Sequence, residues 1–464
     1  MSRKNSFPLN SGLMNMKTEK TTEVIAILIF LIFVDCLAAE PKDELENYEK
    51  YLIYYYLDPQ PQKAPQVFRE FTESKLFTDG KCDDNCQNLM AYFFGRLATI
   101  NPTVIEKFKI LFENSNHKQR ILLLKIFKFC ADDELKLFLT EKSKDNNYAN
   151  EAEQIKQLLK DGIPVQFDPL TNPIKQGADL DFLWSEFMVT GNEKAVKRII
   201  SVLPWYDDHK DLMQMVIAGA ARWSLGSNCK QHKKVLEICQ NELYRSTWPT
   251  KKYLKEIVAE AGGSVLPPGL TSKKMTKIVS RNTTPGMDPN CWGALPVIQY
   301  ILGNKYARVE EKPDPPLKLH GLIIANTPDV WMINLWDKTG QHIVDPDPNG
   351  GYYSLIIPSD EPNMTFKDFT FGAELDFMKK HNVEKSQLEI EQKQYDLYSI
   401  QPGNVKIELI VNKQIPYIVR IFESGKIIHQ ITYDEYKIDL EPDLSLFEPP
   451  EDIEMSETSK GTKN

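Results

Sequence analysis

The chain has 464 residues, enough for two or three domains, and its 65 acidic and 56 basic side chains give a net charge of −9. Hydrophobic residues make up 42% and aromatic residues 10%, which supports packed cores and excludes a mainly disordered protein. The acidic balance also excludes nucleic acid as a partner, because phosphate binding needs a concentrated basic surface.

An apolar run, VIAILIFLIFV, occupies residues 24–34, with basic residues before it and the small residues Ala38 and Ala39 after it. A membrane-spanning helix needs about 20 apolar residues, so this run is too short. The pattern is typical of a cleaved secretory signal peptide, which we place at residues 1–39. An uncleaved anchor is the alternative, and translation could start at Met16.

No later segment is apolar enough to span a bilayer. We therefore expect an exported protein, either periplasmic, with or without outer-membrane association, or secreted. Lipid attachment at Cys36 is disfavoured, because Asp35 stands where lipoproteins carry a small residue.

Six cysteines follow residue 39, and an even number in an exported protein allows disulfides. Two pairs are close enough in sequence to bond locally, Cys82 with Cys86 and Cys229 with Cys239. Buried free thiols are the alternative.

Residues 42–262 are predicted to form a helical domain. Asn101 can cap a helix that begins at Pro102, and Gly191 breaks the pattern between two further helices. The rhythm of short helices and short turns favours a solenoid-like array of helical pairs, although no strict repeat period is visible. A plain helical bundle is the competing interpretation. We expect this domain to bind a protein partner.

Residues 263–290 are rich in glycine and proline and also contain Lys273, Lys274 and Lys277. We interpret this segment as a linker with at most one short helix. Residues 291–454 are predicted to form a sheet domain, because apolar and polar residues alternate there. The clearest part is residues 405–436, where tight turns at Lys413 and Gly425 join three alternating strands into an antiparallel meander. Tyr353–Ile357 is predicted to form a strand, and a helix is expected at about 365–381. Residues 455–464 are expected to form a disordered tail.

The last third of the chain resembles the LolA/LolB-like periplasmic lipoprotein-carrier superfamily. The residues that carry the resemblance are Val411-Asn412-Lys413, Glu423-Ser424-Gly425, Tyr433–Ile438 and Asp443–Ile453. Trp331–Asp337 also resembles a strand pair in which such proteins carry a tryptophan. The opening helix and strands of the family match only loosely, at 294–325. An arginine that controls ligand release in some carriers has no counterpart.

The resemblance implies an open, curved antiparallel sheet covered by helices, whose concave apolar side accepts acyl chains. The expected fold class is therefore α+β, with an all-α array followed by a curved antiparallel sheet and a covering helix. No catalytic residue is implied. The residues that we expect to line a hydrophobic ligand are Trp331, Trp336, Phe369, Phe377, Leu409, Val419 and Ile421. The alternative is that these side chains form the core between sheet and helix.

Motifs for catalysis or metal binding are missing from the sequence. It contains no nucleophile elbow, phosphate loop or dinucleotide fingerprint, and its histidines lack zinc spacing. Residues 345–350 mimic the start of a calcium loop, but its twelfth position is Ile356 rather than Glu. We therefore expect no metal, no cofactor and no enzymatic activity. The sequence predicts a bacterial envelope protein that binds a lipid, an acyl chain or another hydrophobic partner. The alternatives are a secreted interaction module with a purely structural sheet and an enzyme with a site of scattered polar residues.

Overall fold

The computed structural model describes residues 45–130, 132–270, 273–345, 369–381, 383–401 and 405–457. The predicted signal peptide, the loop after residue 345 and the predicted strand at 353–357 lie outside these ranges. The chain divides into two compact units. The helical unit comprises Met1–Tyr244 and Pro249–Val265, and the sheet unit comprises Arg245–Trp248 and Leu266–Asn464. Helices come first and a mainly antiparallel sheet follows, so the predicted α+β class is confirmed.

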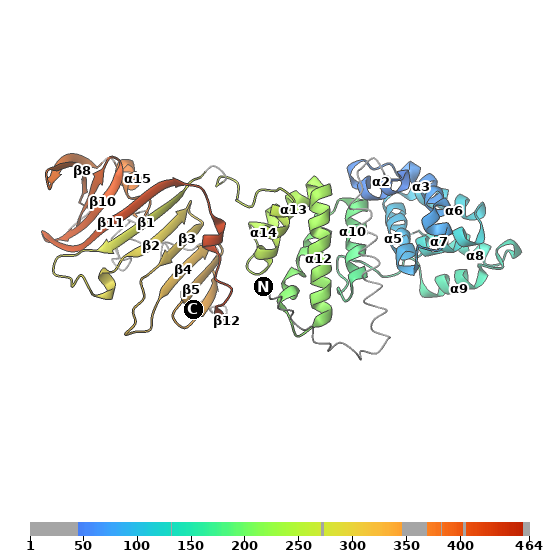
Figure 1. The fold of residues 1–464 in the computed structure, drawn as a ribbon. Helices are drawn as coiled ribbons and strands as arrows, with labels where there is room; N and C mark the ends of the chain where they lie inside the picture. Colours follow the sequence, from blue (N-terminus) through green and yellow to red (C-terminus); the bar gives the residue numbers. More distant parts are fainter. Residues whose placement is uncertain are drawn as a thin grey trace, which may run out of the picture. The chain divides into compact units, whose positions relative to one another are not determined.

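The helical unit is built from α-helices that range from 4 to 20 residues in length (Figure 1). Its described α-helices are α2 (Asn47–Tyr54), α3 (Ala64–Glu73), α4 (Lys75–Thr78), α5 (Asp84–Ile100), α6 (Pro102–Glu113), α7 (His117–Phe127), α8 (Asp133–Lys142), α9 (Ala152–Asp161), α10 (Gly177–Thr190), α11 (Glu193–Ile200), α12 (Leu212–Gln231), α13 (Lys233–Leu243) and α14 (Thr250–Glu260).

The ends of these helices follow local sequence signals. Pro102 is the first residue of α6, as predicted. Asn116 and Gln119 form a reciprocal capping box at the start of α7, which satisfies two backbone N–H groups. Helix α10 ends at Gly191, whose φ of 66° lies in the left-handed region that glycine adopts without strain.

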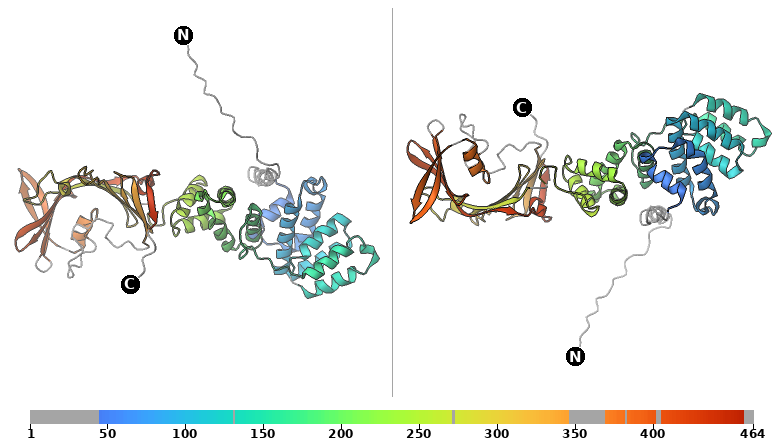
Figure 2. Two further views of the ribbon diagram at one scale, coloured as in Figure 1. Left: turned by 90° about the horizontal axis from the view of Figure 1, so that it is seen from below. Right: turned by 90° about the horizontal axis from the view of Figure 1, so that it is seen from above.

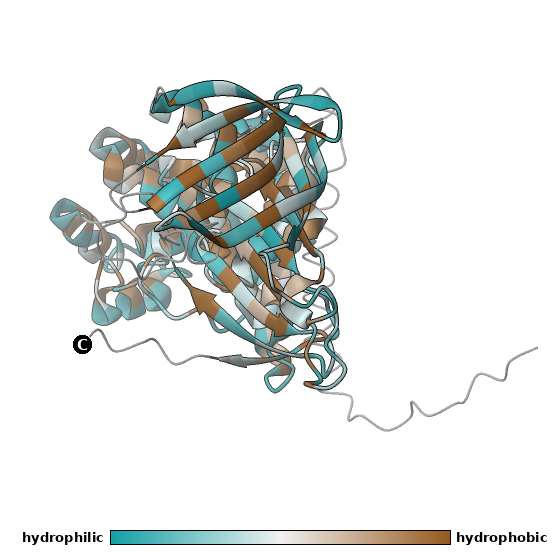
Figure 3. Cartoon of the chain, turned by 90° about the vertical axis from the view of Figure 1, so that its left-hand side faces the viewer, coloured by the Kyte–Doolittle hydropathy of each residue, from teal (hydrophilic) through white to brown (hydrophobic). Residues whose placement is uncertain are grey.

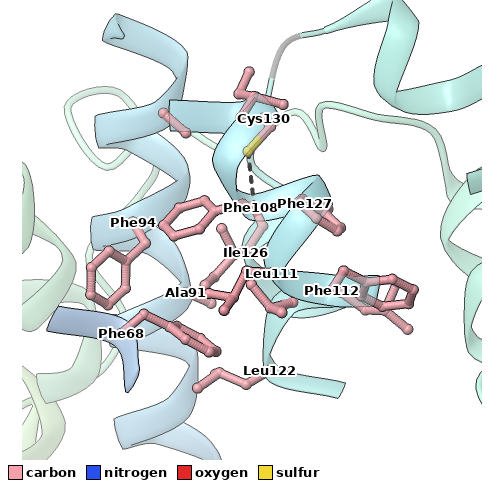
Figure 4. Close-up of a cluster of buried hydrophobic side chains, with 14 of the residues drawn as sticks. Phe68, Ala91, Phe94, Phe108, Leu111, Phe112, Leu122, Ile126, Phe127 and Cys130 are labelled. Atoms are coloured by element: carbon pink, nitrogen blue, oxygen red, sulfur yellow. Dashed lines mark hydrogen bonds between the residues drawn. The ribbon is translucent and has the colours of Figure 1, made fainter. Parts of the chain in front are cut away.

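Two hydrophobic cores hold the helical unit together. The first joins helices from α2 to α9 and contains many fully buried aromatic rings, several of which Figure 4 shows between α5, α6 and α7. The second joins α10 to α14 around side chains such as Leu183, Phe187 and Ile199. Each short helix therefore depends on packing against its neighbours rather than on intrinsic helix propensity.

The sheet unit contains a single sheet of twelve described strands. They are β1 (Met275–Asn282), β2 (Val297–Leu302), β3 (Tyr306–Glu310), β4 (Gly321–Asn326), β5 (Asp329–Asn334), β6 (Thr339–Val344), β7 (Glu384–Ile390), β8 (Lys393–Ile400), β9 (Val405–Asn412), β10 (Ile415–Glu423), β11 (Lys426–Leu440) and β12 (Glu454–Glu457). Their order is β12-β6-β5-β4-β3-β2-β1-β11-β10-β9-β8-β7. All neighbours are antiparallel except β12 and β6, which are parallel.

The predicted meander at residues 405–436 is confirmed as β9, β10 and β11. Lys413 and Gln414 have φ values of 47° and 70°, and Ser424 and Gly425 have values of 49° and 79°. Two successive residues with positive φ are typical of the tight turns whose twist matches that of paired strands.

Three expectations need correction. The segment 263–290 is not simply a linker, because β1 lies within it and pairs on both sides, with β2 and β11. The tail is ordered in part, because β12 pairs with β6. The expected helix at 365–381 is shorter within the described residues, where α15 spans Glu374–Lys380. Among the described residues, none of the helices is both long and apolar enough to cross a membrane.

Candidate functional site

The face of the sheet that packs against α15 is apolar. Figure 2 shows that the sheet is strongly curved and that α15 lies on its concave side. Side chains from α15 form one buried cluster with residues of β8, β9, β10 and β11. The register places four of these sheet residues in one row across the strands, because directly paired residues share a face. The row is Tyr398, Leu409, Val419 and Ile431.

The same face stays apolar across the other half of the sheet. Ile301 of β2 packs against the cluster under α15, and the register continues from it across β3 to β6. This second row is Ile301, Ala307, Ala325, Val330 and Ile343. Ala307, Ala325 and Val330 are buried in a cluster whose described members all come from β3 to β6. Figure 3 shows the underlying pattern, with hydrophobic and hydrophilic residues alternating along the strands.

A buried carboxylate attaches α15 to the sheet. Glu374 is the first residue of α15 and is fully buried. Its two side-chain oxygens accept hydrogen bonds from the hydroxyls of Tyr433 at 2.7 Å and Tyr436 at 2.8 Å, and from the N–H of Gly372 at 3.0 Å. Burial raises the pKa of Glu374 above its usual range, and the hydrogen bonds oppose this effect.

An irregularity in β11 brings the two tyrosines together. Residues three apart in a regular strand point to opposite faces, so Tyr433 and Tyr436 would normally be separated. Between Val279 and Ser280 of β1, however, the pairing with β11 jumps from Glu435 to Tyr433, which leaves one extra residue on β11. Such a bulge re-aims the side chains around it. As a result, both tyrosines reach Glu374, and their rings lie 5.5 Å apart.

The structure brings together five of the seven residues predicted to line a ligand. Phe369, Phe377, Leu409, Val419 and Ile421 all belong to the cluster under α15. In the structure they form the packed contact between helix and sheet.

The two tryptophans lie elsewhere. Trp331 is buried on the opposite face of the sheet, where its ring meets that of Trp248 edge to face at 5.6 Å and stacks on His342 at 5.3 Å. Asp329 accepts hydrogen bonds from the Trp248 backbone N–H and from the His342 ring. Trp336 lies in the turn after β5 and is 45% exposed. Neither tryptophan contributes to the concave face.

Of the two predicted cysteine pairs, one forms a disulfide and the other does not. Cys82 and Cys86 form a disulfide between the loop that precedes α5 and the first turn of α5. Cys229 and Cys239 are both buried free thiols, which is the alternative that the sequence left open.

Sequence reasoning missed Glu374, Tyr433 and Tyr436 as a group. The one available signal was a glutamate inside the apolar segment FTFGAELDFM, where an acidic side chain has to find a polar partner if the helix is buried. The identity of that partner could not be read from the sequence, because it depends on the bulge in β11.

No protein-family model matches the chain, and no curated protein matches its sequence. Similar solved structures include an uncharacterized conserved protein from Thermus thermophilus, with 8% identity and a TM-score of 0.25 over 40% of this chain and 92% of that one. They also include LolA superfamily protein NE2245 from Nitrosomonas europaea, with 10% identity and a TM-score of 0.19 over 38% of this chain and 90% of that one. A putative outer membrane lipoprotein-sorting protein domain from Vibrio parahaemolyticus has 9% identity and a TM-score of 0.19 over 38% and 87% of the two chains. The LolA superfamily is the family that the last third of the sequence resembles.

Proposed function

We propose that the sheet unit is a non-enzymatic binding domain that holds an acyl chain or a similarly apolar ligand on its concave face, with α15 as a displaceable cover. The observation that carries this proposal is the extent of the apolar face. Its rows run from β8 to β6, whereas the described contacts of α15 are with the β8 to β11 half. Outside the residues that α15 contacts, Ile323 and Ile343 are only partly buried and Met332 is exposed, so this half of the face offers surface for an apolar ligand.

The side chains next to the apolar rows favour an uncharged ligand. A neighbouring row on the same face consists of Ile278, Gln299, Val309, Ile323, Met332 and Gln341. None of these side chains is charged. Burial also lowers the pKa of His429, which is paired with Ile421, and so favours the uncharged form of this imidazole. An acyl chain fits such a surface better than a peptide with charged side chains.

The attachment of α15 is suited to displacement. A seven-residue helix is not stable by itself, so its position depends on its contacts with the sheet. One of these contacts is the buried Glu374 carboxylate, which regains hydration when α15 moves into water. This hydration offsets part of the loss of the hydrogen bonds that hold Glu374 to the sheet.

Export of the chain to a bacterial envelope rests on the predicted signal peptide and remains part of the proposal. So does binding of a protein partner by the helical unit. If the sheet is purely structural, the protein is instead an interaction module that acts through its helices.

Binding of cis-parinaric acid, a fluorescent fatty acid, to the full chain tests the proposal. We expect saturable binding, and we expect Ile323→Trp to weaken it about tenfold or more by filling the concave face. Leu397→Trp is a matched control, because Leu397 is also a partly buried aliphatic residue but lies on the opposite face. The proposal fails if the chain binds no probe and purifies without lipid, or if both variants change the affinity equally.

A further inference from the structure

Strand β7 (Glu384–Ile390) forms one edge of the sheet. All seven of its residues pair with β8 in an uninterrupted antiparallel register, from Glu384 opposite Ser399 to Ile390 opposite Lys393. In the sheet as described, no strand pairs with the outer side of β7. An edge strand of this kind presents unpaired N–H and C=O groups to any strand that can approach it.

β7 lacks most of the features that usually block edge pairing. It contains no proline and no bulge, and it is longer than a typical protected edge strand. Its first four side chains and Glu389 are exposed. Charge is the one blocking feature that it has. Whether its charges repel or attract a neighbour therefore depends on the charges of the approaching strand.

The charges of β7 are complementary to those of a second copy of β7. When two copies run antiparallel with all seven residues paired, Gln387 faces its own counterpart at the centre. Lys385 of each copy then lies directly opposite Glu389 of the other copy. Two opposite-charge pairs form across the contact, and such pairs stabilise antiparallel strands.

Neighbouring registers lose this match. A slip of one residue in one direction places Glu384 opposite the second copy's Glu389, and like charges directly opposite destabilise the pair. A slip in the other direction places Lys385 opposite the second copy's Ile390, which leaves the charge without its partner. The register with the most backbone pairing is therefore also the one with the best charge pairing.

Side chains on β8 extend the charge pattern. Lys385 Nζ lies 3.1 Å from Asp396, and Glu389 accepts a hydrogen bond from Gln394 at 2.9 Å. In the paired arrangement, each Lys385 lies between its own Asp396 and the second copy's Glu389. On the other face, the Leu388 side chains of the two copies become diagonal neighbours across the contact.

We propose that β7 pairs antiparallel with β7 of a second copy of this chain, so that two sheets join edge to edge into a two-fold symmetric dimer. The occupant of the edge is a second copy because the strand is charge-complementary to itself in full register. The dimer is independent of the ligand proposed for the concave face.

A charge-swap experiment on the full chain tests this dimer. Sedimentation equilibrium should show a dimer for the unaltered chain. Lys385→Glu puts glutamates opposite Glu389 in both pairs, and Glu389→Lys puts lysines opposite Lys385. Each variant alone should dimerise at least about tenfold more weakly. An equimolar mixture of the two variants should form a heterodimer, because both pairs again join opposite charges.

Two controls separate the contact from effects on folding. Lys426→Glu changes the same kind of exposed charge at the turn between β10 and β11 and should leave the dimer unchanged. Gln387→Cys leaves all charges in place and puts two thiols opposite each other at the two-fold centre. Under oxidation it should form a covalent dimer, whereas Ser386→Cys should not, since its counterpart is Leu388.

The proposal is overturned by any of three results: a monomeric unaltered chain, single variants that dimerise like the unaltered chain, or a mixture that fails to restore the dimer. If the charge variants do not fold, the Gln387→Cys result decides. A covalent dimer supports the contact, and a chain that stays monomeric under oxidation rejects it.

Discussion

Arg96 of α5 and Glu186 of α10 form a two-point ion pair inside the helical unit. Arg96 Nε lies 2.9 Å from one carboxylate oxygen of Glu186, and Nη2 lies 3.1 Å from the other. The Tyr92 hydroxyl donates a third hydrogen bond to this carboxylate at 2.7 Å. Helix α5 belongs to the first hydrophobic core and most buried residues of α10 belong to the second, so this polar group lies between helices of the two cores.

Arg96→Ala should destabilise the helical unit. Glu186 is almost completely buried, so removal of its cationic partner leaves a carboxylate with one donor and little access to water. We expect a loss of about 2–3 kcal/mol in the free energy of unfolding, measured by urea denaturation. Lys81→Ala, which removes an exposed ion pair with Asp79, is the control and should change stability by less than about 1 kcal/mol. Equal effects of the two substitutions would contradict this prediction.

Glu374→Gln should make the protein less sensitive to rising pH. Burial raises the pKa of Glu374 above its ordinary value of 4.5, so the folded state holds this proton more tightly than the unfolded chain. The resulting contribution to stability is fully present below the unfolded pKa and is lost as pH rises through the folded pKa. The variant carries no titrating group here and keeps its stability.

The measurement is urea denaturation of both proteins at a series of pH values. As pH rises from about 4.5 to 8, the free energy of unfolding of Glu374→Gln should increase relative to that of the unaltered chain. Asp376→Asn, on the exposed side of α15, is a matched control and should show no such trend. Parallel pH profiles for the unaltered chain and Glu374→Gln would show that the buried carboxylate does not control this stability.

The Cys82–Cys86 disulfide should contribute modestly to stability. It closes a very short loop, for which chain-entropy arguments give about 2 kcal/mol. Replacing both cysteines with serine should lower the free energy of unfolding by no more than this amount. Alkylation of the denatured chain with and without a reductant should reveal two additional reactive thiols after reduction. An unchanged number of thiols would mean that the bond does not form in the protein.

Trp331→Phe should separate stability from binding. Trp331 is buried between Trp248 and His342 on the face opposite to α15, so a smaller ring leaves a cavity there. We expect a loss of about 1–3 kcal/mol in stability and an unchanged affinity for cis-parinaric acid. If Trp331→Phe abolished probe binding without lowering stability, the ligand would lie on the face of the sheet opposite to α15. That result would contradict our proposal.

The meander of β9 to β11 could be predicted because its signals are local. Apolar and polar residues alternate within each strand, and the turns at Lys413 and Gly425 have a characteristic composition. β1 was missed because its signals are not local. Lysines and turn-forming residues surround it, and its place in the sheet depends on pairing with β11 near the other end of the chain.

The site was predicted in part for the same reason. Alternation shows that a strand has two faces, but it does not show which faces of distant strands lie together. Leu409 and Val419 are neighbours in one meander, and their shared face could be inferred. Trp331 lies in β5, in the half of the sheet formed by β1 to β6. Nothing in the sequence of β5 indicates that the Trp331 side chain points to the face opposite to that of Leu409 and Val419. The bulge that turns Tyr433 and Tyr436 to one side is equally invisible in the sequence.

The central β1–β11 ladder has a consequence for the order in which the sheet unit forms. β1 to β6 are complete well before the ribosome has synthesised β11, and each of these strands pairs with its neighbour in sequence. Until β11 emerges, β1 is an open edge in the middle of the future sheet, exposed to the same mispairing as any other unprotected edge. A nascent chain that stalls before residue 426 should therefore depend on chaperones. The half of the sheet formed by β1 to β6 can join the half formed by β7 to β11 only after the carboxyl-terminal strands have left the ribosome.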